Sequence, residues 1–213
     1  ITNEIKRRVA GIGKETGADV VIVEIGGTVG DIESQPFLEA LRQLRNEVGR
    51  ENVYFIHVTW LPYIGATGEI KTKPTQHSVA ALRSIGISPN MIIARSDYQI
   101  DRDLCDKIAL FCDVEKQAVV PMVTSDVLYE VPLLLERAGV GDYLVEKLNM
   151  KATRTPDMKP WEKLVERVRK EKPTVKVALV GKYVELQDAY MSVREALKHA
   201  ALANAVEVEI GWV

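Results

Sequence analysis

Short apolar runs alternate with helix-like segments over the first 148 residues, and this alternation is the feature that most constrains the fold. The runs DVVIVE (19–24), VYFIHVTW (53–60), MIIAR (91–95) and AVVPM (118–122) are continuous and rich in β-branched residues, as buried strands usually are. Strands that alternate with helices form parallel sheets covered on both faces. We therefore expect an α/β fold with a mostly parallel sheet and helices on both faces.

Helices are expected between these runs. The segment FLEALRQLRNEVG (37–49) has apolar residues three and four apart and stops at Gly49, where a helix commonly ends. The other predicted helices cover residues 4–15, 75–86, 102–112 and 129–139, the last with Pro132 near its start, where proline is tolerated. Ligands of such folds bind at the carboxyl ends of the strands, so the residues that follow each strand are the most informative.

The chain changes character after residue 148. Residues 149–173 contain prolines and one charged amphipathic segment, which predicts a linker whose helix packs through Trp161, Leu164, Val165 and Val168. Residues 174–213 predict a single strand–helix–strand unit, and a unit of about 40 residues cannot bury both of its own faces. Because the first residue is Ile and the last run is strand-like, we expect an internal fragment with an incomplete second domain.

Composition excludes several classes of protein. The chain has 28 basic and 30 acidic residues, a net charge of −2 and no block of five or six like charges, so we expect neither nucleic-acid nor membrane-surface binding. No apolar run reaches the roughly 18 residues of a transmembrane helix, and the N-terminus lacks a signal-peptide core. Cys105 and Cys112 fall on one predicted helix, about 10.5 Å apart, too far for a disulfide. Free thiols predict a reducing compartment, the cytoplasm.

Glu24 is the first candidate for chemistry. It ends a buried apolar run and precedes a glycine-rich turn with Gly26, Gly27 and Gly30. Nucleotide-hydrolysing enzymes place a magnesium-directing carboxylate at such a position. The alternative is a solvated glutamate at a strand end. Asp31 and Glu33 lie on the same loop and have two similar interpretations. They could take part in the chemistry of the site, or they could simply cap the next helix, since acids near a helix start are favoured.

The segment KTKPTQ, residues 71–76, is the second candidate. Lys71 and Lys73 lie two residues apart in a loop that Pro74 keeps extended. The hydroxyls of Thr72 and Thr75 and the amide of Gln76 add donors, and the free N–H groups of the following helix point back at the loop. Ammonium groups beside a helix N-terminus make an anion site, which predicts a polyphosphate cradle. The alternative is a solvated surface loop.

The histidines and the known phosphate and nucleophile motifs add little. His57 lies within a predicted strand and is interpreted as a core residue, His77 follows the lysine loop, and His199 falls in the last predicted helix. The sequence contains no G-x-x-x-x-G-K-[ST] phosphate loop and no G-x-S-x-G or equivalent cysteine elbow.

Four long strings carry a resemblance to a known family. They are EIGGTVGDIES (24–34), GEIKTKPTQHSV (68–79), DKIALFC (106–112) and VALVGKYVELQDAY (177–190). Together and in order, they resemble the CTP synthases, glutamine-dependent ligases of pyrimidine biosynthesis that convert UTP to CTP. The resemblance implies that residues 1–148 are the C-terminal part of the synthetase (amidoligase) domain, with a fold like that of P-loop and dethiobiotin-synthetase-like domains. It also implies that residues 149–173 are an interdomain linker. Residues 174–213 would open a class I glutamine amidotransferase domain.

The resemblance also implies roles for particular residues. Glu24 resembles a magnesium ligand, and Lys71 a catalytic residue. The site shared by UTP and CTP would be formed by Lys71, Thr72, Lys73, Pro74, Thr75, Gln76 and Lys107. The pocket for the inhibitor's cytidine end would be formed by Asp31, Ile32, Glu33 and Phe111, and the contact with ATP by Val123, Thr124 and Ser125. Mg²⁺ would be the cofactor, ATP and glutamine co-substrates, GTP an allosteric activator, and the assembly a homotetramer with nucleotide sites between subunits.

The expected reaction has two stages: ATP phosphorylates O4 of UTP, and ammonia from glutamine then displaces the phosphate. The chain lacks the family's phosphate loop, a second magnesium carboxylate, the ammonia-gating segment and the glutaminase cysteine, histidine and glutamate, so we expect an inactive fragment. Two other readings remain. One is a different ATP-dependent ligase or partition-type ATPase on the same fold, and the other a non-catalytic nucleotide sensor or filament-forming subunit.

Overall fold

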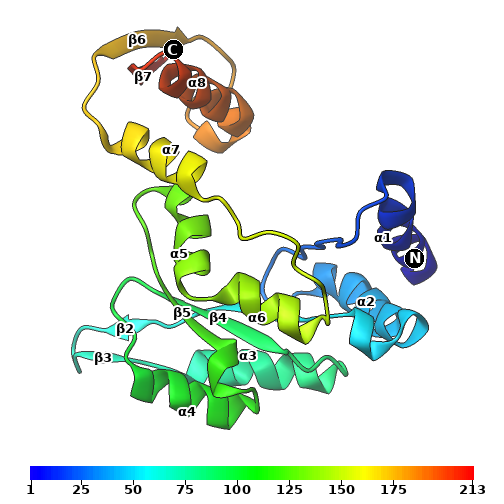
Figure 1. The fold of residues 1–213 in the computed structure, drawn as a ribbon. Helices are drawn as coiled ribbons and strands as arrows, with labels where there is room; N and C mark the ends of the chain where they lie inside the picture. Colours follow the sequence, from blue (N-terminus) through cyan, green and yellow to red (C-terminus); the bar gives the residue numbers. More distant parts are fainter. The chain divides into compact units, whose positions relative to one another are not determined.

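The fold is described from a computed structural model that covers residues 1–213. The chain forms two compact units, which are described separately (Figure 1). The first comprises Ile1–Thr124 and Arg137–Thr153, and the second Ser125–Glu136 and Arg154–Val213. The expected domain limits at residues 148 and 173 stay predictions.

A parallel sheet of three strands organises the first unit. Its strands are β1 (Ile56–Trp60), β4 (Met91–Ser96) and β5 (Val119–Val123), in the order β1-β4-β5. Both pairs are parallel, with Val58 opposite Ile93 and Ile93 opposite Val120. The carboxyl ends of all three strands therefore lie along one edge of the sheet, and the prediction of a parallel α/β sheet is confirmed.

Helices cover both faces of this sheet (Figure 1). The bounds in the first unit are α1 Thr2–Thr16, α2 Gln35–Val48, α3 Lys73–Ser84, α4 Arg102–Cys112 and α6 Val140–Lys147. Helices α3 and α4 lie on one face and α6 on the other. The core between the sheet and the first pair contains Leu61, Val79, Ile92, Ile108 and Cys112, each at most 1% exposed. Short 3₁₀ turns occur at Ile32–Ser34, Arg50–Asn52 and Lys116–Ala118.

Local sequence signals explain where these helices begin and end. The carboxylate of Asp101 accepts a hydrogen bond of 2.8 Å from the backbone N–H of Leu104, which caps α4. Gly17 ends α1 with a φ of 66°, a left-handed conformation that glycine adopts without strain. Proline stands in the first turn of both α2 and α3, where its missing N–H costs nothing.

The prediction of a strand over residues 19–24 is wrong. These residues have no regular secondary structure, and the side chain of Ile22 is 91% exposed. An apolar run becomes a strand only where a neighbouring strand supplies hydrogen-bond partners, and no strand of the chain pairs with this one. The residues just after it, Ile25 and Val29, instead pack against Leu38, Leu82 and Ile87.

The segment expected to be a simple loop after β1 contains a small hairpin. Strands β2 (Tyr63–Ile64) and β3 (Glu69–Ile70) are antiparallel, with Tyr63 opposite Ile70. The turn between them contains Gly68 at a φ of 65°. The hairpin carries the chain from the edge of the sheet to the predicted lysine loop.

The second unit contains the predicted strand–helix–strand. Its elements are the 3₁₀ turns Leu128–Glu130 and Gln187–Tyr190, α5 (Val131–Arg137, whose last residue belongs to the first unit), α7 (Lys159–Arg169), β6 (Thr174–Leu179), α8 (Met191–Ala203) and β7 (Glu207–Trp212). Strands β6 and β7 are parallel. Val165 of α7 is buried with Val127 and Leu133, and Val168 packs beside them as predicted, whereas Trp161 remains 38% exposed. None of the helices is long and apolar enough to cross a membrane.

Candidate functional site

The lysine loop lies at the carboxyl edge of the sheet and is held by backbone hydrogen bonds. The N–H of Leu61, just after β1, donates to the carbonyl of Arg95 at 2.7 Å, and the N–H of Lys71 donates to the carbonyl of Pro62 at 2.9 Å. Helix α3 begins at Lys73, two residues earlier than predicted, so this lysine stands in the first turn. The free N–H groups of that turn and two ammonium groups therefore occur in one short stretch, as an anion site requires.

Two of the expected donors in this loop are already used inside the protein. Thr75 is 1% exposed, and its hydroxyl donates to the hydroxyl of Thr59 on β1 at 3.0 Å. The hydroxyl of Thr72 accepts a hydrogen bond from the side-chain amide of Gln76 at 3.1 Å. Lys73, which is exposed, and the first-turn N–H groups remain open to a ligand, whereas Lys71 has Glu69 as an internal partner.

Glu69 is the internal partner of Lys71, and the charge of Lys107 on α4 also affects its pKa. The ammonium of Lys71 pairs with the carboxylate of Glu69 on β3. The hydrogen bond from Lys71 lowers the pKa of Glu69, and the positive charge of Lys107 on α4 lowers this pKa further. Lys71 and Lys107 thus act on the same carboxylate from different elements. Phe111 is 57% exposed one helical turn after Lys107, on the same face of α4.

The structure gathers the predicted carboxylates in a separate cavity of about 320 Å³. Glu24, Asp31 and Glu33 line it together with Ser34 and Phe37, among others. The N–H of Thr28 donates to the carboxylate of Asp31 at 2.8 Å, which closes the glycine turn. Gly27 has a φ of 86°, and a Cβ there would stand 3.1 Å from that carboxylate, so the turn requires glycine.

The donor set of this cavity suits only one mode of magnesium binding. No group of three or more acidic, histidine or cysteine side chains has an arrangement that could hold a metal ion. Asp31 is engaged with the backbone, and Ile32, between the acids, is 80% exposed. Mg²⁺ is commonly held by one or two carboxylates together with substrate phosphates. Glu24 fits that mode, and the cavity does not fit a cage made by the protein alone.

The predicted ATP-contacting residues lie at the end of β5 and directly after it. The N–H of Thr124 donates to the carbonyl of Ser96 at 2.8 Å, so this stretch extends the carboxyl edge of the sheet beside β4. Val123 is the last residue of β5. The hydroxyl of Ser125, in the second unit, donates to Glu130 at 2.8 Å.

The histidines and cysteines have structural contacts. His57 is half-buried and lies 2.8 Å from the hydroxyl of Ser78, and burial lowers the pKa of its imidazole, so it has an internal partner as interpreted but lies outside the buried core. Within the second unit, His199 lies 2.7 Å from the hydroxyl of Tyr129. His77 is exposed. Cys105 and Cys112 are free and buried, and burial raises the pKa of both thiols, as expected for packing residues.

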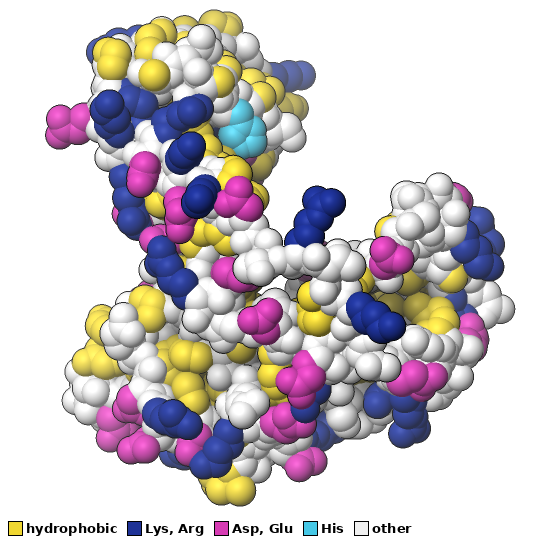
Figure 2. Space-filling view, viewed as in Figure 1, with side chains coloured by type: hydrophobic (Ala, Val, Ile, Leu, Met, Phe, Trp, Pro, Cys, Tyr) yellow, Lys and Arg dark blue, Asp and Glu magenta, His cyan; other side chains and the backbone are white.

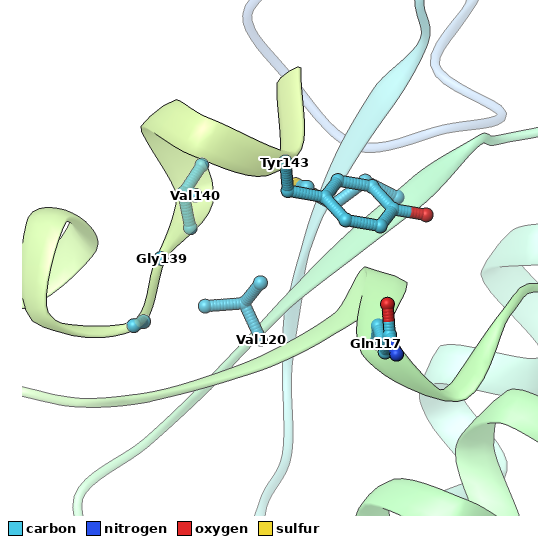
Figure 3. Close-up of a pocket in the computed structure, with 7 residues that line it drawn as sticks. Gln117, Val120, Gly139, Val140 and Tyr143 are labelled. Atoms are coloured by element: carbon cyan, nitrogen blue, oxygen red, sulfur yellow. The ribbon is translucent and has the colours of Figure 1, made fainter. Parts of the chain in front are cut away.

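A second cavity, of about 240 Å³, has none of these residues in its lining (Figure 3). Its lining includes Met91, Val120, Val140 and Tyr143, and Gln117 contributes a side-chain amide. Met91 begins β4 and Val120 stands near the start of β5, so the cavity is at the amino edge of the sheet. The sequence reasoning missed it because α6 was not recognised as a separate helix. The visible face in Figure 2 shows Lys and Arg side chains interspersed with Asp and Glu, without a large patch of one sign.

The fold places the chain in the class of α/β proteins with a parallel sheet, and comparisons with known proteins give its family. The family model described as CTP synthase N-terminus matches residues 1–150 of the sequence. CTP synthases of Roseiflexus sp. (strain RS-1), Roseiflexus castenholzii and Chloroflexus aggregans are 61%, 59% and 60% identical over all 213 residues. The chain therefore belongs to the CTP synthase family. It spans only 38–39% of the length of these relatives.

Proposed function

We propose that this chain carries the part of a CTP synthase that binds the triphosphate of UTP and of the inhibitor CTP. The observation that supports the proposal is the position of Lys71 and Lys73 at the start of α3, where the first-turn N–H groups have no partner within the helix. A nucleoside triphosphate presents several negative charges, and two ammonium groups beside a helix N-terminus match them. In the complete enzyme these groups hold the nucleotide while ATP and ammonia convert its 4-oxygen to an amino group.

The other predicted residues take their roles around this group. Glu24 would hold Mg²⁺ together with substrate phosphates, and the ion would supply positive charge against them. Asp31, Ile32, Glu33 and Phe111 would receive the cytidine end of the inhibitor, and Val123, Thr124 and Ser125 would contact ATP. GTP would act as an activator of the complete enzyme. By this proposal the chain alone is inactive.

The carboxylate cavity and the lysine group have no residue in common. We propose that they complete each other between subunits of a homotetramer, so that one chain supplies the phosphate site and another the pyrimidine pocket. The residues from 174 onwards would begin the glutamine amidotransferase domain that supplies ammonia.

The test uses the full-length enzyme and calorimetric binding of UTP and CTP. A charge-assisted lysine–phosphate contact is worth about 1.5–3 kcal/mol, so Lys71→Ala should weaken the binding of both nucleotides by roughly 10- to 150-fold. Lys163→Ala, at an exposed lysine of α7, is the matched control and should bind like the wild type. An affinity of Lys71→Ala within about twofold of the wild type, less than half a kcal/mol, would show that the loop is only a solvated surface.

A further inference from the structure

Two tyrosine rings stack on the surface beside the lysine loop. The ring of Tyr63, on β2, and the ring of Tyr98, just after β4, have centroids 4.0 Å apart and planes inclined by 28°. Tyr63 is 39% exposed and Tyr98 is 51% exposed. The pair therefore joins two segments that are distant in sequence without belonging to the buried core.

One ring is fixed to the sheet. The N–H of Tyr98 donates to the hydroxyl of Ser96 at 3.2 Å, and Ser96 is completely buried at the end of β4. The carbonyl of Ser96 in turn accepts the N–H of Thr124 at 2.8 Å, which ties this turn to the residue after β5. Tyr98 is thus mounted on the ends of two paired strands.

The other ring belongs to the element that holds Lys71. Tyr63 is paired with Ile70 across the hairpin, and the carbonyl of the preceding Pro62 accepts the N–H of Lys71 at 2.9 Å. Strands β2 and β3 have only two residues each, and isolated hairpins are at best marginally stable in water. A contact outside the hairpin is needed to keep it, and with it Lys71, in one place.

We propose that the Tyr63–Tyr98 stack is a positioning device that holds the hairpin, and through it Lys71, where a nucleotide triphosphate binds. The inference rests on the proposed function of Lys71 as a phosphate ligand. Neither tyrosine needs to touch the nucleotide. An aromatic pair contributes about 0.5–1.5 kcal/mol beyond its buried area, which corresponds to roughly 2- to 12-fold in affinity if Lys71 depends on it fully.

The test measures UTP binding and steady-state kinetics of the full-length enzyme carrying Tyr98→Leu, Tyr63→Leu or Tyr98→Phe. Each leucine variant should raise the dissociation constant and the KM for UTP by roughly 2- to 12-fold, with kcat at saturating UTP retained. The Phe variant keeps the ring and should behave like the wild type. Tyr183→Leu, at a tyrosine that is 67% exposed in the second unit, should leave UTP binding unchanged.

Combination with Lys71→Ala separates the inference from the proposed function. If the stack acts through Lys71, Tyr98→Leu should add no further loss of UTP affinity in the Lys71→Ala background. An equal further loss would overturn the inference, because the ring would then act independently of the lysine. If both leucine variants bind UTP like the wild type while Lys71→Ala binds it weakly, the positioning role of the stack would be overturned and the proposed function of Lys71 would stand. Normal binding by Lys71→Ala would overturn the proposed function and the inference with it.

Discussion

The buried hydroxyl pair between α3 and β1 leads to a prediction that separates a structural role of Thr75 from a ligand role. Thr75 and Thr59 are 1% and 7% exposed, and their hydroxyls lie 3.0 Å apart. Thr75→Val keeps the shape but leaves the hydroxyl of Thr59 without this partner. A buried polar group left unpaired costs about 1–3 kcal/mol, so the free energy of unfolding should fall by that amount.

Replacing both partners should restore most of the loss, because two apolar groups of the same shape leave no unsatisfied hydroxyl. The double variant Thr59→Val/Thr75→Val should therefore be more stable than either single variant. Urea unfolding would be followed by the fluorescence of Trp60, with Trp161 and Trp212 replaced by Phe, so that the signal reports the first unit alone. Additive losses in the double variant, or a loss below about 0.5 kcal/mol in the single ones, would refute the reasoning. If Thr75 instead donates to the nucleotide, the UTP affinity of the full-length enzyme should fall both in Thr75→Val and in the double variant, although the double variant regains stability.

Two further predictions concern charge. Glu69→Gln should release Lys71 from its internal partner and lower the dissociation constant for UTP of the full-length enzyme, as measured by calorimetry. The control Glu51→Gln, at an exposed glutamate elsewhere, should leave this constant unchanged. Weaker UTP binding by Glu69→Gln would contradict the prediction and mean that the carboxylate orients the lysine. Burial lowers the pKa of His57 below its ordinary 6.5, so the unfolded chain takes up the proton first and the free energy of unfolding should fall as the pH drops below about 6.5. In His57→Gln, the fall in the free energy of unfolding below about pH 6.5 should be smaller, as measured by urea unfolding at a series of pH values. The same pH dependence in the variant and the wild type would contradict the assignment.

Sequence patterns predict most strands and helices of this fold correctly, but they do not show whether an apolar run has a neighbouring strand to pair with. The strands β1, β4 and β5 and the helices between them follow directly from apolar runs and helical spacing. Residues 19–24 carry an equally strong β-branched run, yet they form no strand. Strand formation depends on a hydrogen-bonding neighbour that periodicity within the run does not contain. The hairpin β2–β3 was missed for the opposite reason, because strands of two residues are too short to show any period.

The candidate site was predictable in its residue types and less so in their partners. Lys71 and Lys107 are distant in sequence, and only the fold shows that Lys71 pairs with Glu69 and that the charge of Lys107 also lowers the pKa of this carboxylate. The glutamate was not singled out, although it stands two residues before a lysine in a hairpin strand, a spacing that puts both side chains on one face. The carboxylate cavity, in contrast, is formed locally, since Glu24, Asp31 and Glu33 all fall within ten residues of the sequence.

The inward orientation of Thr75 was visible in the sequence as a helical period. Thr75, Val79 and Leu82 are spaced by four and three residues, and all three are buried on the face of α3 that packs against the core. The opposite stripe carries Lys73 and His77, which are exposed. Once the helix begins at Lys73, its geometry decides which donors of its first turn can meet an anion. Lys73 is exposed and the first-turn N–H groups have no partner within the helix, whereas the hydroxyl of Thr75 is bonded to Thr59 on β1. The segment therefore combines two functions in six residues, because its outward stripe provides charge while its inward stripe anchors that charge to β1.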